Sequence, residues 1–269
     1  MNKYERKTVA QVMGIESKYT DHQGIEIETE GSSLPMINTP VWKSEADNSL
    51  RGESFEYVLR KPIRFGEEDK ALAEIKEHWE GNGAKIKDSP NAGVHVHINC
   101  SDLTVTQLFN YISLYLVVEE LLIAKCGDDR VGNLFCLRAS DADYLIEMLA
   151  ESVRSQDLRM LHTDDLRYAS VNVKALGDYG SLEFRAWRAD GDLEAIAWWC
   201  RLLQYLKGLA RKIDNPSQIV GDVSALGSYG FYSHVLGPFA KDVEWDDKFE
   251  PAISDSVRRV QQYAFLGDW

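Results

Sequence analysis

Three short segments of this chain alternate apolar with polar residues, and this alternation constrains the fold more than any other feature. They read GIEIETEG (24–31), GVHVHIN (93–99) and SLEFRAW (181–187). Successive side chains of an extended strand point to opposite faces, so each segment predicts a strand with one apolar and one polar face. Such strands favour a sheet that buries one face and leaves the other for polar chemistry.

Helical patterns between and after these strands predict the cover for the apolar face. The pattern from residue 67 to 79 is amphipathic and ends at GNG (81–83), and the long apolar pattern that follows ends at Gly127. The expected helices span residues 67–79, 104–126, 142–154 and 192–212.

The remaining segments are less regular. Residues 54–62 predict a strand that ends at Pro62, and residues 167–187 predict a hairpin with GDYG as its turn. Residues 32–52 are rich in Ser, Pro, Asn and Gly and predict a long functional loop, whereas residues 213–269 show no clear period. We therefore expect an α+β fold in one domain over residues 1–269. Its antiparallel sheet would carry helices on one face and an active site on the other, with the motifs in residues 20–212 and a C-terminal extension in residues 213–269.

Composition restricts the partners. The chain has 43 acidic and 30 basic side chains and a net charge of −13, which argues against nucleic acid or an anionic membrane as the main partner. Its four cysteines lack C-x-x-C spacing, which predicts free thiols in a reducing compartment. No leader pattern or uninterrupted apolar run of about 18 residues is evident, so we expect a cytoplasmic protein.

Functional groups occur in pairs at i and i+2 on the polar faces of the predicted strands. The pairs are Glu26 with Glu28, His95 with His97 and Glu183 with Arg185, and Glu56 could add another carboxylate. If the strands lie side by side, four carboxylates and two imidazoles surround one arginine. Such oxygen-dominated sites suit Mg²⁺ or Mn²⁺, and the arginine indicates an anion with several oxygens, such as phosphate.

Each pair alone also fits a solvated strand face or a surface ion pair, and it is their joint occurrence that favours a site. A rival class is a metal-dependent hydrolase or cupin-like protein, in which H-x-H binds a transition metal. Such sites usually need a further imidazole or a glutamate shortly afterwards. The other histidines form no second cluster: His22, His78, His162 and His234.

The order of five segments resembles the amidoligases of glutamine synthetase and glutamate–cysteine ligase type, in particular the small type common in phages and bacteria. The segments, within about residues 20–210, are GIEIETEG, DNSLRGESFEYVLRKP, GVHVHIN, RYASVNV and GSLEFRAWRADGD. The resemblance implies a glutamine synthetase-like sheet and an ATP-dependent ligase that joins a carboxylate to an amine through an acyl phosphate. Its cofactors would be ATP and two or three Mg²⁺ or Mn²⁺ ions.

The resemblance also implies roles for individual residues. The metal ligands would be Glu26, Glu28, Glu56, His95 and Glu183. Arg185 would stabilise the phosphoryl group during transfer. Nucleotide or substrate contacts would come from His97, Asn99, Asp47, Ser49, Asn172 and Arg188.

The resemblance leaves some points open. Its partners would be a small-molecule, peptide or protein carboxylate and an amine, in the cytoplasm or in the host cytoplasm if a phage encodes the chain. Glutamine synthetase supplies more carboxylates between the E-x-E and H-x-H strands, where only Glu53 and Glu56 are close candidates here, so the number of metal ions stays open. A third alternative is a binding protein that keeps the fold without turnover. The absence of a G-x-x-x-x-G-K-[ST] motif fits a nucleotide held by metals and strands.

Overall fold

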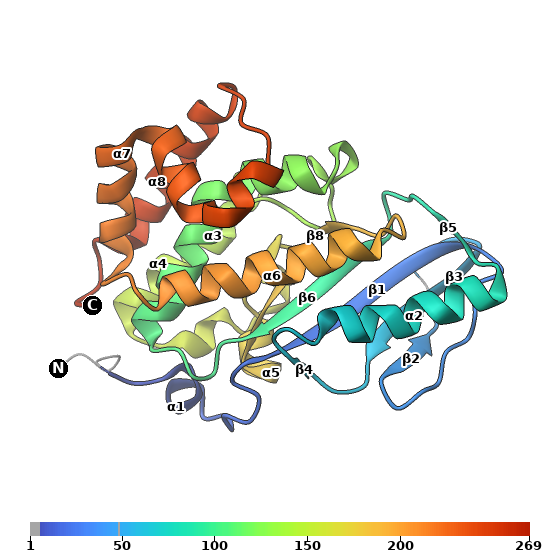
Figure 1. Cartoon of the computed structure of the whole chain (residues 1–269). Helices are drawn as coiled ribbons and strands as arrows, with labels where there is room; N and C mark the ends of the chain where they lie inside the picture. Colours follow the sequence, from blue (N-terminus) through green and yellow to red (C-terminus); the bar gives the residue numbers. More distant parts are fainter. Residues whose placement is uncertain (1–5, 48) are drawn as a thin grey trace.

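An antiparallel sheet of eight strands forms the centre of the fold in the computed structural model, which describes residues 6–47 and 49–269 (Figure 1). The strands are β1 (His22–Ser32), β2 (Trp42–Glu45), β3 (Glu53–Leu59), β4 (Ile63–Arg64), β5 (Lys85–Lys87), β6 (Gly93–Asn99), β7 (Val171–Asn172) and β8 (Ser181–Arg188). Their order is β2-β3-β1-β6-β8-β7, and β4 and β5 each pair with β1. The chain therefore has the predicted α+β class.

Helices follow and interrupt the strands. Within the described residues they are α1 (Val9–Met13), α2 (Glu68–Asn82), α3 (Val105–Cys126), α4 (Asp143–Ser155), α5 (Ala175–Tyr179), α6 (Leu193–Ala210), α7 (Pro216–Leu236) and α8 (Phe249–Ala264). Short 3₁₀ turns occupy Asp128–Arg130, Leu158–Leu161, Asp164–Leu166 and Gly237–Asp242.

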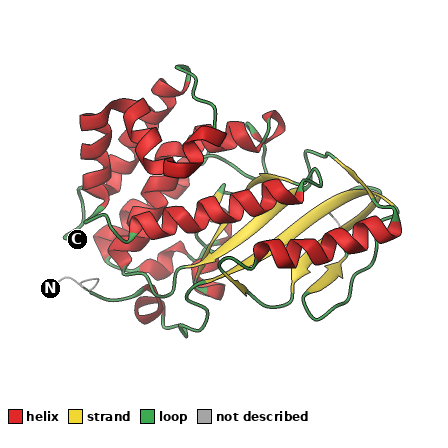
Figure 2. Ribbon diagram, in the orientation of Figure 1, coloured by secondary structure: helices red, strands yellow, loops and turns green. Residues whose placement is uncertain are grey.

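Helices α2, α3 and α6 pack on the apolar face of the sheet (Figure 2). The indole of Trp42 on β2 donates a hydrogen bond of 2.8 Å to the carbonyl of Ala71 on α2. On β8, Trp187 stacks against Trp199 of α6 at 5.3 Å between ring centroids. Phe184 packs its ring against Tyr111 and Tyr115 of α3. Strand β2 thus buries its apolar side under α2, and β8 buries its apolar side under both α6 and α3.

Helix α3 is the central core helix. It begins at a capping box in which Thr104 and Gln107 bond to each other's backbone N–H. Its length and composition alone would suit a membrane span, but most of it is buried within the protein. The C-terminal helices α7 and α8 also pack on α3, and the hydroxyl of Tyr263 on α8 bonds to that of Ser113 on α3. Residues 213–269 therefore contribute to the same core.

Most of the predicted elements are confirmed to within a few residues, but two predictions are wrong. The segment read as a tight turn is the end of α5, which connects β7 to β8 and stops at Gly180 with φ of 68°. A glycine after a short helix and a glycine in a turn look alike in sequence, since both allow positive φ. The predicted loop 32–52 contains strand β2, and β3 ends at Leu59, three residues before Pro62.

Strand β8 contains a bulge opposite β6. Val94 on β6 pairs with Trp187 on β8. Two residues further along β6, Val96 pairs with Phe184, three residues back along β8. A bulge leaves its extra residue outside the regular ladder and re-aims the side chains around it. As a result Trp187 faces the helices, whereas strict alternation would have placed it beside Glu183 on the polar face.

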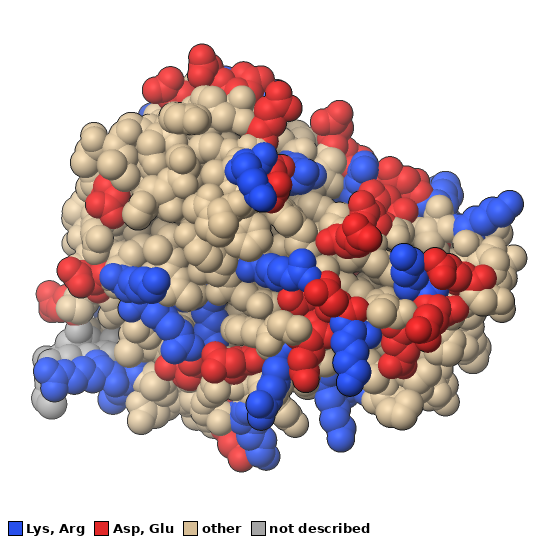
Figure 3. All heavy atoms as spheres, in the orientation of Figure 1, with Lys and Arg blue, Asp and Glu red and all other residues tan. Residues whose placement is uncertain are grey.

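On the side shown in Figure 3, acidic and basic side chains are mixed in the lower and right-hand parts of the surface, and the upper left carries few charges. All four cysteines are buried free thiols. Burial raises the pKa of the Cys100 thiol to about 11, which makes it unreactive at neutral pH.

Candidate active site

The register of the central strands brings the predicted pairs together on the polar face. Across β1 and β6, Glu26 lies opposite His95. Across β1 and β3, Glu28 lies opposite Glu56. Across β6 and β8, His97 lies opposite Glu183. Directly opposed side chains of an antiparallel pair lie about 5 Å apart at Cβ, so these groups form one cluster.

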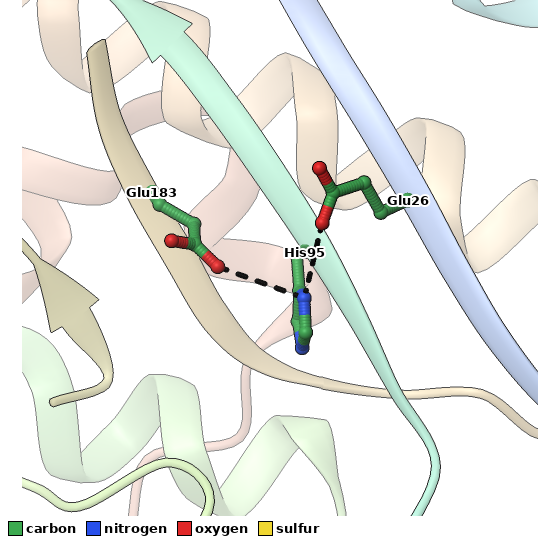
Figure 4. Close-up of side chains that lie close together, drawn as sticks. All are labelled: Glu26, His95 and Glu183. Atoms are coloured by element: carbon green, nitrogen blue, oxygen red, sulfur yellow. Dashed lines mark hydrogen bonds and ion pairs between the residues drawn. The ribbon is translucent and has the colours of Figure 1, made fainter. Parts of the chain in front are cut away.

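His95 occupies the centre of the cluster (Figure 4). Its side chain is buried, and its ring nitrogens face different carboxylates. Nδ1 lies 3.4 Å from Oε2 of Glu26 and 3.6 Å from Oε1 of Glu183. Nε2 lies 3.7 Å from Oε1 of Glu28. One imidazole is therefore surrounded by carboxylates from both neighbouring strands.

These side chains form two groups that could each hold a cation. In one group, ligand atoms of Glu26, His95 and Glu183 lie within 4.8 Å of one another, and in the other so do atoms of Glu28, Glu56 and His95. Carboxylate oxygens with a single imidazole fit Mg²⁺ or Mn²⁺. A neutral imidazole has only one nitrogen lone pair, so His95 can ligate an ion in only one group at a time. When His95 ligates an ion in one group, the other group offers carboxylate ligands alone.

Arg185 and Asn172 fix the orientation of Glu183. The guanidinium of Arg185 forms an ion pair with Oε1 of Glu183, and its Nη1 lies 3.5 Å from Nδ1 of His95. Asn172 donates a hydrogen bond of 2.5 Å from Nδ2 to Oε2 of the same carboxylate. Arg185 also donates from Nε to the carbonyl of Phe135 at 3.3 Å. Both oxygens of Glu183 therefore have defined partners.

His97 lies beside the cluster rather than inside it. Its Nε2 is 3.4 Å from Oε1 of Glu26, and its Nδ1 is 3.2 Å from the hydroxyl of Ser181. The ring of Tyr179 meets it edge-on at 5.7 Å. Burial lowers the pKa of His97, but the hydrogen bond to Glu26 and the charge of Glu183 outweigh this effect and raise it.

The carboxyl groups differ in their protonation. Burial raises the pKa of Glu26, but hydrogen bonds from His95 and His97 outweigh this and lower it well below its usual range. The pKa of Glu183 is also lowered, because the charges of His97 and Arg185 outweigh burial. Burial, and then the charge of Glu26, raises the pKa of Glu56 to about 7. Glu26 and Glu183 are thus ionised at neutral pH, whereas the carboxyl group of Glu56 is partly protonated.

The other predicted contact residues lie around the edges of this face. Asn99 at the end of β6 accepts hydrogen bonds from the N–H and hydroxyl of Ser101. Asp47 accepts a hydrogen bond of 2.8 Å from the N–H of Ser49. Arg188 forms ion pairs with two aspartates, Asp88 and Asp190. Their contacts with nucleotide or substrate stay predictions, as do the ligand roles above.

One carboxylate of this face was missed by the sequence analysis. Glu30 follows Glu28 at i+2 on β1, and it accepts hydrogen bonds from the N–H of Arg51 and from Lys87. The alternation in GIEIETEG was the signal that could have identified it. Glu53, named beside Glu56 as a candidate in the sequence, accepts a hydrogen bond from the N–H of Leu34 and lies outside both cation-binding groups.

A comparison with family models matches residues 6–206 to the family described as "putative amidoligase enzyme". This match covers most of the chain. The chain belongs to this amidoligase family. The matched residues include all of the sheet and most of α6, and they exclude α7 and α8. No curated protein matches the chain. Membership in an amidoligase family indicates a ligase, and the polar face described above lies entirely within the matched residues.

Proposed function

We propose that this amidoligase is an ATP-dependent carboxylate–amine ligase that activates its carboxylate substrate as an acyl phosphate. The observation that carries the proposal is the position of His95 between Glu26 and Glu183, with Arg185 ion-paired to Glu183. This arrangement combines cation ligands with a fixed positive charge, both of which stabilise the charge that moves during phosphoryl transfer from ATP.

The carboxylates would hold the metal ions. Glu26, His95 and Glu183 would form one site, and Glu28 with Glu56 would form a second, and His95 would ligate the ion of only one site at a time. Mg²⁺ or Mn²⁺ bound there would screen the charge of ATP and polarise its γ-phosphate. Asn172 would keep Glu183 in place through its hydrogen bond to Oε2.

Arg185 would act on the group being transferred. A carboxylate is a poor electrophile, so the γ-phosphoryl group passes from ATP to a carboxylate oxygen, and ADP leaves. The amine then attacks the carbonyl carbon, the C–O bond to phosphate breaks, and the amine loses one proton. The guanidinium of Arg185 would stabilise the negative charge on the phosphoryl oxygens during the first step.

The remaining contacts would bind nucleotide and substrate. His97 lies next to Glu26 at one end of the cluster, where it would contact the nucleotide or the substrate. The carboxylate could belong to a small molecule, a peptide or a protein. We place the reaction in the cytoplasm, or in the host cytoplasm for a phage-encoded chain, and assign it to a single catalytic domain over residues 1–269 with a glutamine synthetase-like sheet.

Product analysis tests this proposal. The protein is incubated with metabolite pools, ATP and Mg²⁺, and the products are identified by mass spectrometry. A ligase gives a new amide and one ADP for each amide, and both are lost when ATP is omitted. Products that gain the mass of water without release of ADP would instead identify a metal-dependent hydrolase. Nucleotide binding without any turnover on such pools would favour a binding protein.

A further inference from the structure

Arg130 lies buried beside the polar face, in the 3₁₀ turn that follows α3. Its guanidinium donates three hydrogen bonds to backbone carbonyls. Nε bonds to the carbonyl of Ala186 at 3.0 Å and Nη2 to that of Arg185 at 2.9 Å. Nη1 bonds to the carbonyl of Ala92 at 3.4 Å. Arg130 therefore connects the start of β6 to the middle of β8.

The two carbonyls on β8 belong to the bulge. Arg185 and Ala186 lie between the pairs Val94–Trp187 and Val96–Phe184, where the ladder is interrupted. Buried carbonyls that lose their ladder partners are costly unless another donor reaches them. The planar fork of Arg130 supplies such donors for both carbonyls.

Gly93 brings Arg130 close to the proposed metal ligands. A methyl group on Gly93 would lie 3.0 Å from Nη2 of Arg130, 3.4 Å from Oε2 of Glu28 and 3.5 Å from Nε2 of His95. The N–H of Gly93 also donates a hydrogen bond of 2.8 Å to Oε2 of Glu28. Guanidinium, carboxylate and imidazole thus converge on the one position of β6 that has no side chain.

Among the described residues, Arg130 forms no ion pair with any carboxylate. Its three hydrogen bonds go to backbone carbonyls instead. We propose that Arg130 is a positioning residue of the metal-binding face: by holding the bulge of β8, it sets Arg185 and Glu183 against His95. This inference rests on the proposed function, because it concerns the metal groups named there.

Two variants test it without changing any charge or any proposed ligand. Arg130→Lys keeps the positive charge but cannot reach all three carbonyls. Gly93→Ala keeps Arg130 itself and crowds its Nη2 by one methyl group. Arg138→Lys is the matched control, since Arg138 lies in the same segment but bonds to Glu120 and Asp141. Mn²⁺ affinity is measured by electron paramagnetic resonance, and folding by the melting temperature.

We expect both Arg130→Lys and Gly93→Ala to weaken Mn²⁺ binding about 10-fold or more, as changes to residues behind metal ligands typically do. The control should bind Mn²⁺ like the wild type. A lower melting temperature with unchanged Mn²⁺ affinity in both variants would overturn the inference and leave Arg130 a purely structural residue.

The two proposals fail differently. Wild-type protein that binds no Mn²⁺ would refute the proposed metal centre, and the inference with it. A folded Arg130→Lys variant that binds Mn²⁺ as tightly as the wild type would refute the role of Arg130 alone. The methyl group of Gly93→Ala also lies 3.4 Å from Oε2 of Glu28 and 3.5 Å from Nε2 of His95, so weaker Mn²⁺ binding in this variant supports the inference only together with the same loss in an Arg130 variant. If Arg130→Lys does not fold, Arg130→Gln, whose side-chain amide still donates to a backbone carbonyl, decides the question.

Discussion

Glu26 and His95 lie directly opposite each other on β1 and β6, with Oε2 of the carboxylate 3.4 Å from Nδ1 of the ring. This pair joins the segments GIEIETEG and GVHVHIN. Glu183 reaches the same nitrogen at 3.6 Å from β8, on the other side of β6. Three strands far apart in sequence thus contribute one group each to a single cluster, in which β6 is the central strand.

Substitution of Arg185 tests the transfer step. Arg185→Ala should lower ATP-dependent ADP release by about two to four orders of magnitude, because it removes roughly 3 to 5 kcal/mol of transition-state stabilisation. Arg185→Lys should restore part of the rate, since a point charge cannot reproduce the planar fork. Rates are normalised to folded protein, because Glu183 loses a buried partner. Full activity in Arg185→Ala, matching the exposed control Arg159→Ala, would contradict the assigned role.

Asn172 should matter for metal affinity although it is not a proposed ligand. Asn172→Leu removes the donor that holds Oε2 of Glu183 and keeps a similar volume. We expect Mn²⁺ affinity to fall about 10-fold to 100-fold. Isothermal titration with Mn²⁺ measures this change, with Asn82→Leu at the end of α2 as the control. Equal affinities in all three proteins would show that Glu183 needs no such support.

Glu119 predicts a pH dependence of stability. It is buried on α3, where it accepts hydrogen bonds from Ser170 and from the N–H of Ala139. Burial raises its pKa to about 7. The folded state therefore holds this proton more tightly than the unfolded state, whose pKa lies near 4.3. The stabilisation is present below about pH 4 and is lost as the pH rises through 7.

Glu119→Gln removes this titration and keeps an acceptor for Ala139. Relative to the wild type, its free energy of unfolding should improve by up to about 3 kcal/mol between pH 5 and 8. Chemical denaturation across this range measures the difference, and Glu151→Gln on the exposed side of α4 is the control. A difference that does not change with pH would show that Glu119 does not titrate in this window.

The C-terminal helices should be necessary for stability. Tyr263 of α8 packs its ring against Phe109 and bonds to the hydroxyl of Ser113, both on α3. Tyr263→Ala should cost about 3 to 5 kcal/mol, because it leaves a cavity in the core. Tyr263→Phe should cost only about 1 kcal/mol, the value of one buried hydrogen bond. Near-native stability of Tyr263→Ala would mean that α8 is a separate appendage.

The elements with strict alternation were predictable from the sequence. GVHVHIN predicts the bounds of β6 because each apolar residue needs burial and each histidine needs the other face. Pairing of Glu26 with His95 was not predictable, since the register of β1 against β6 depends on the connections between the strands. The clustering of the carboxylates could therefore be expected, but the contacts of His95 with two separate groups could not.

Other features left no local signal in the sequence. Arg130 lies in an irregular segment, DDRVG, and its role depends on carbonyls of β6 and β8. Helix α7 lacks a clear apolar period because its helical conformation breaks at Gly227, where φ is 70°. Such features arise from packing between distant segments, which pattern analysis of a single segment does not capture.

ATP binding with and without divalent cations tests the central claim most directly. A cluster of Glu26, Glu28 and Glu183 repels a nucleotide with a charge of about −4 unless cations lie between them. Calorimetry should therefore give ATP affinity at least about 10-fold higher with Mg²⁺ than with a chelator. Glu183→Gln should remove most of that difference. Equal ATP affinity under both conditions would contradict a metal-dependent nucleotide site on this face.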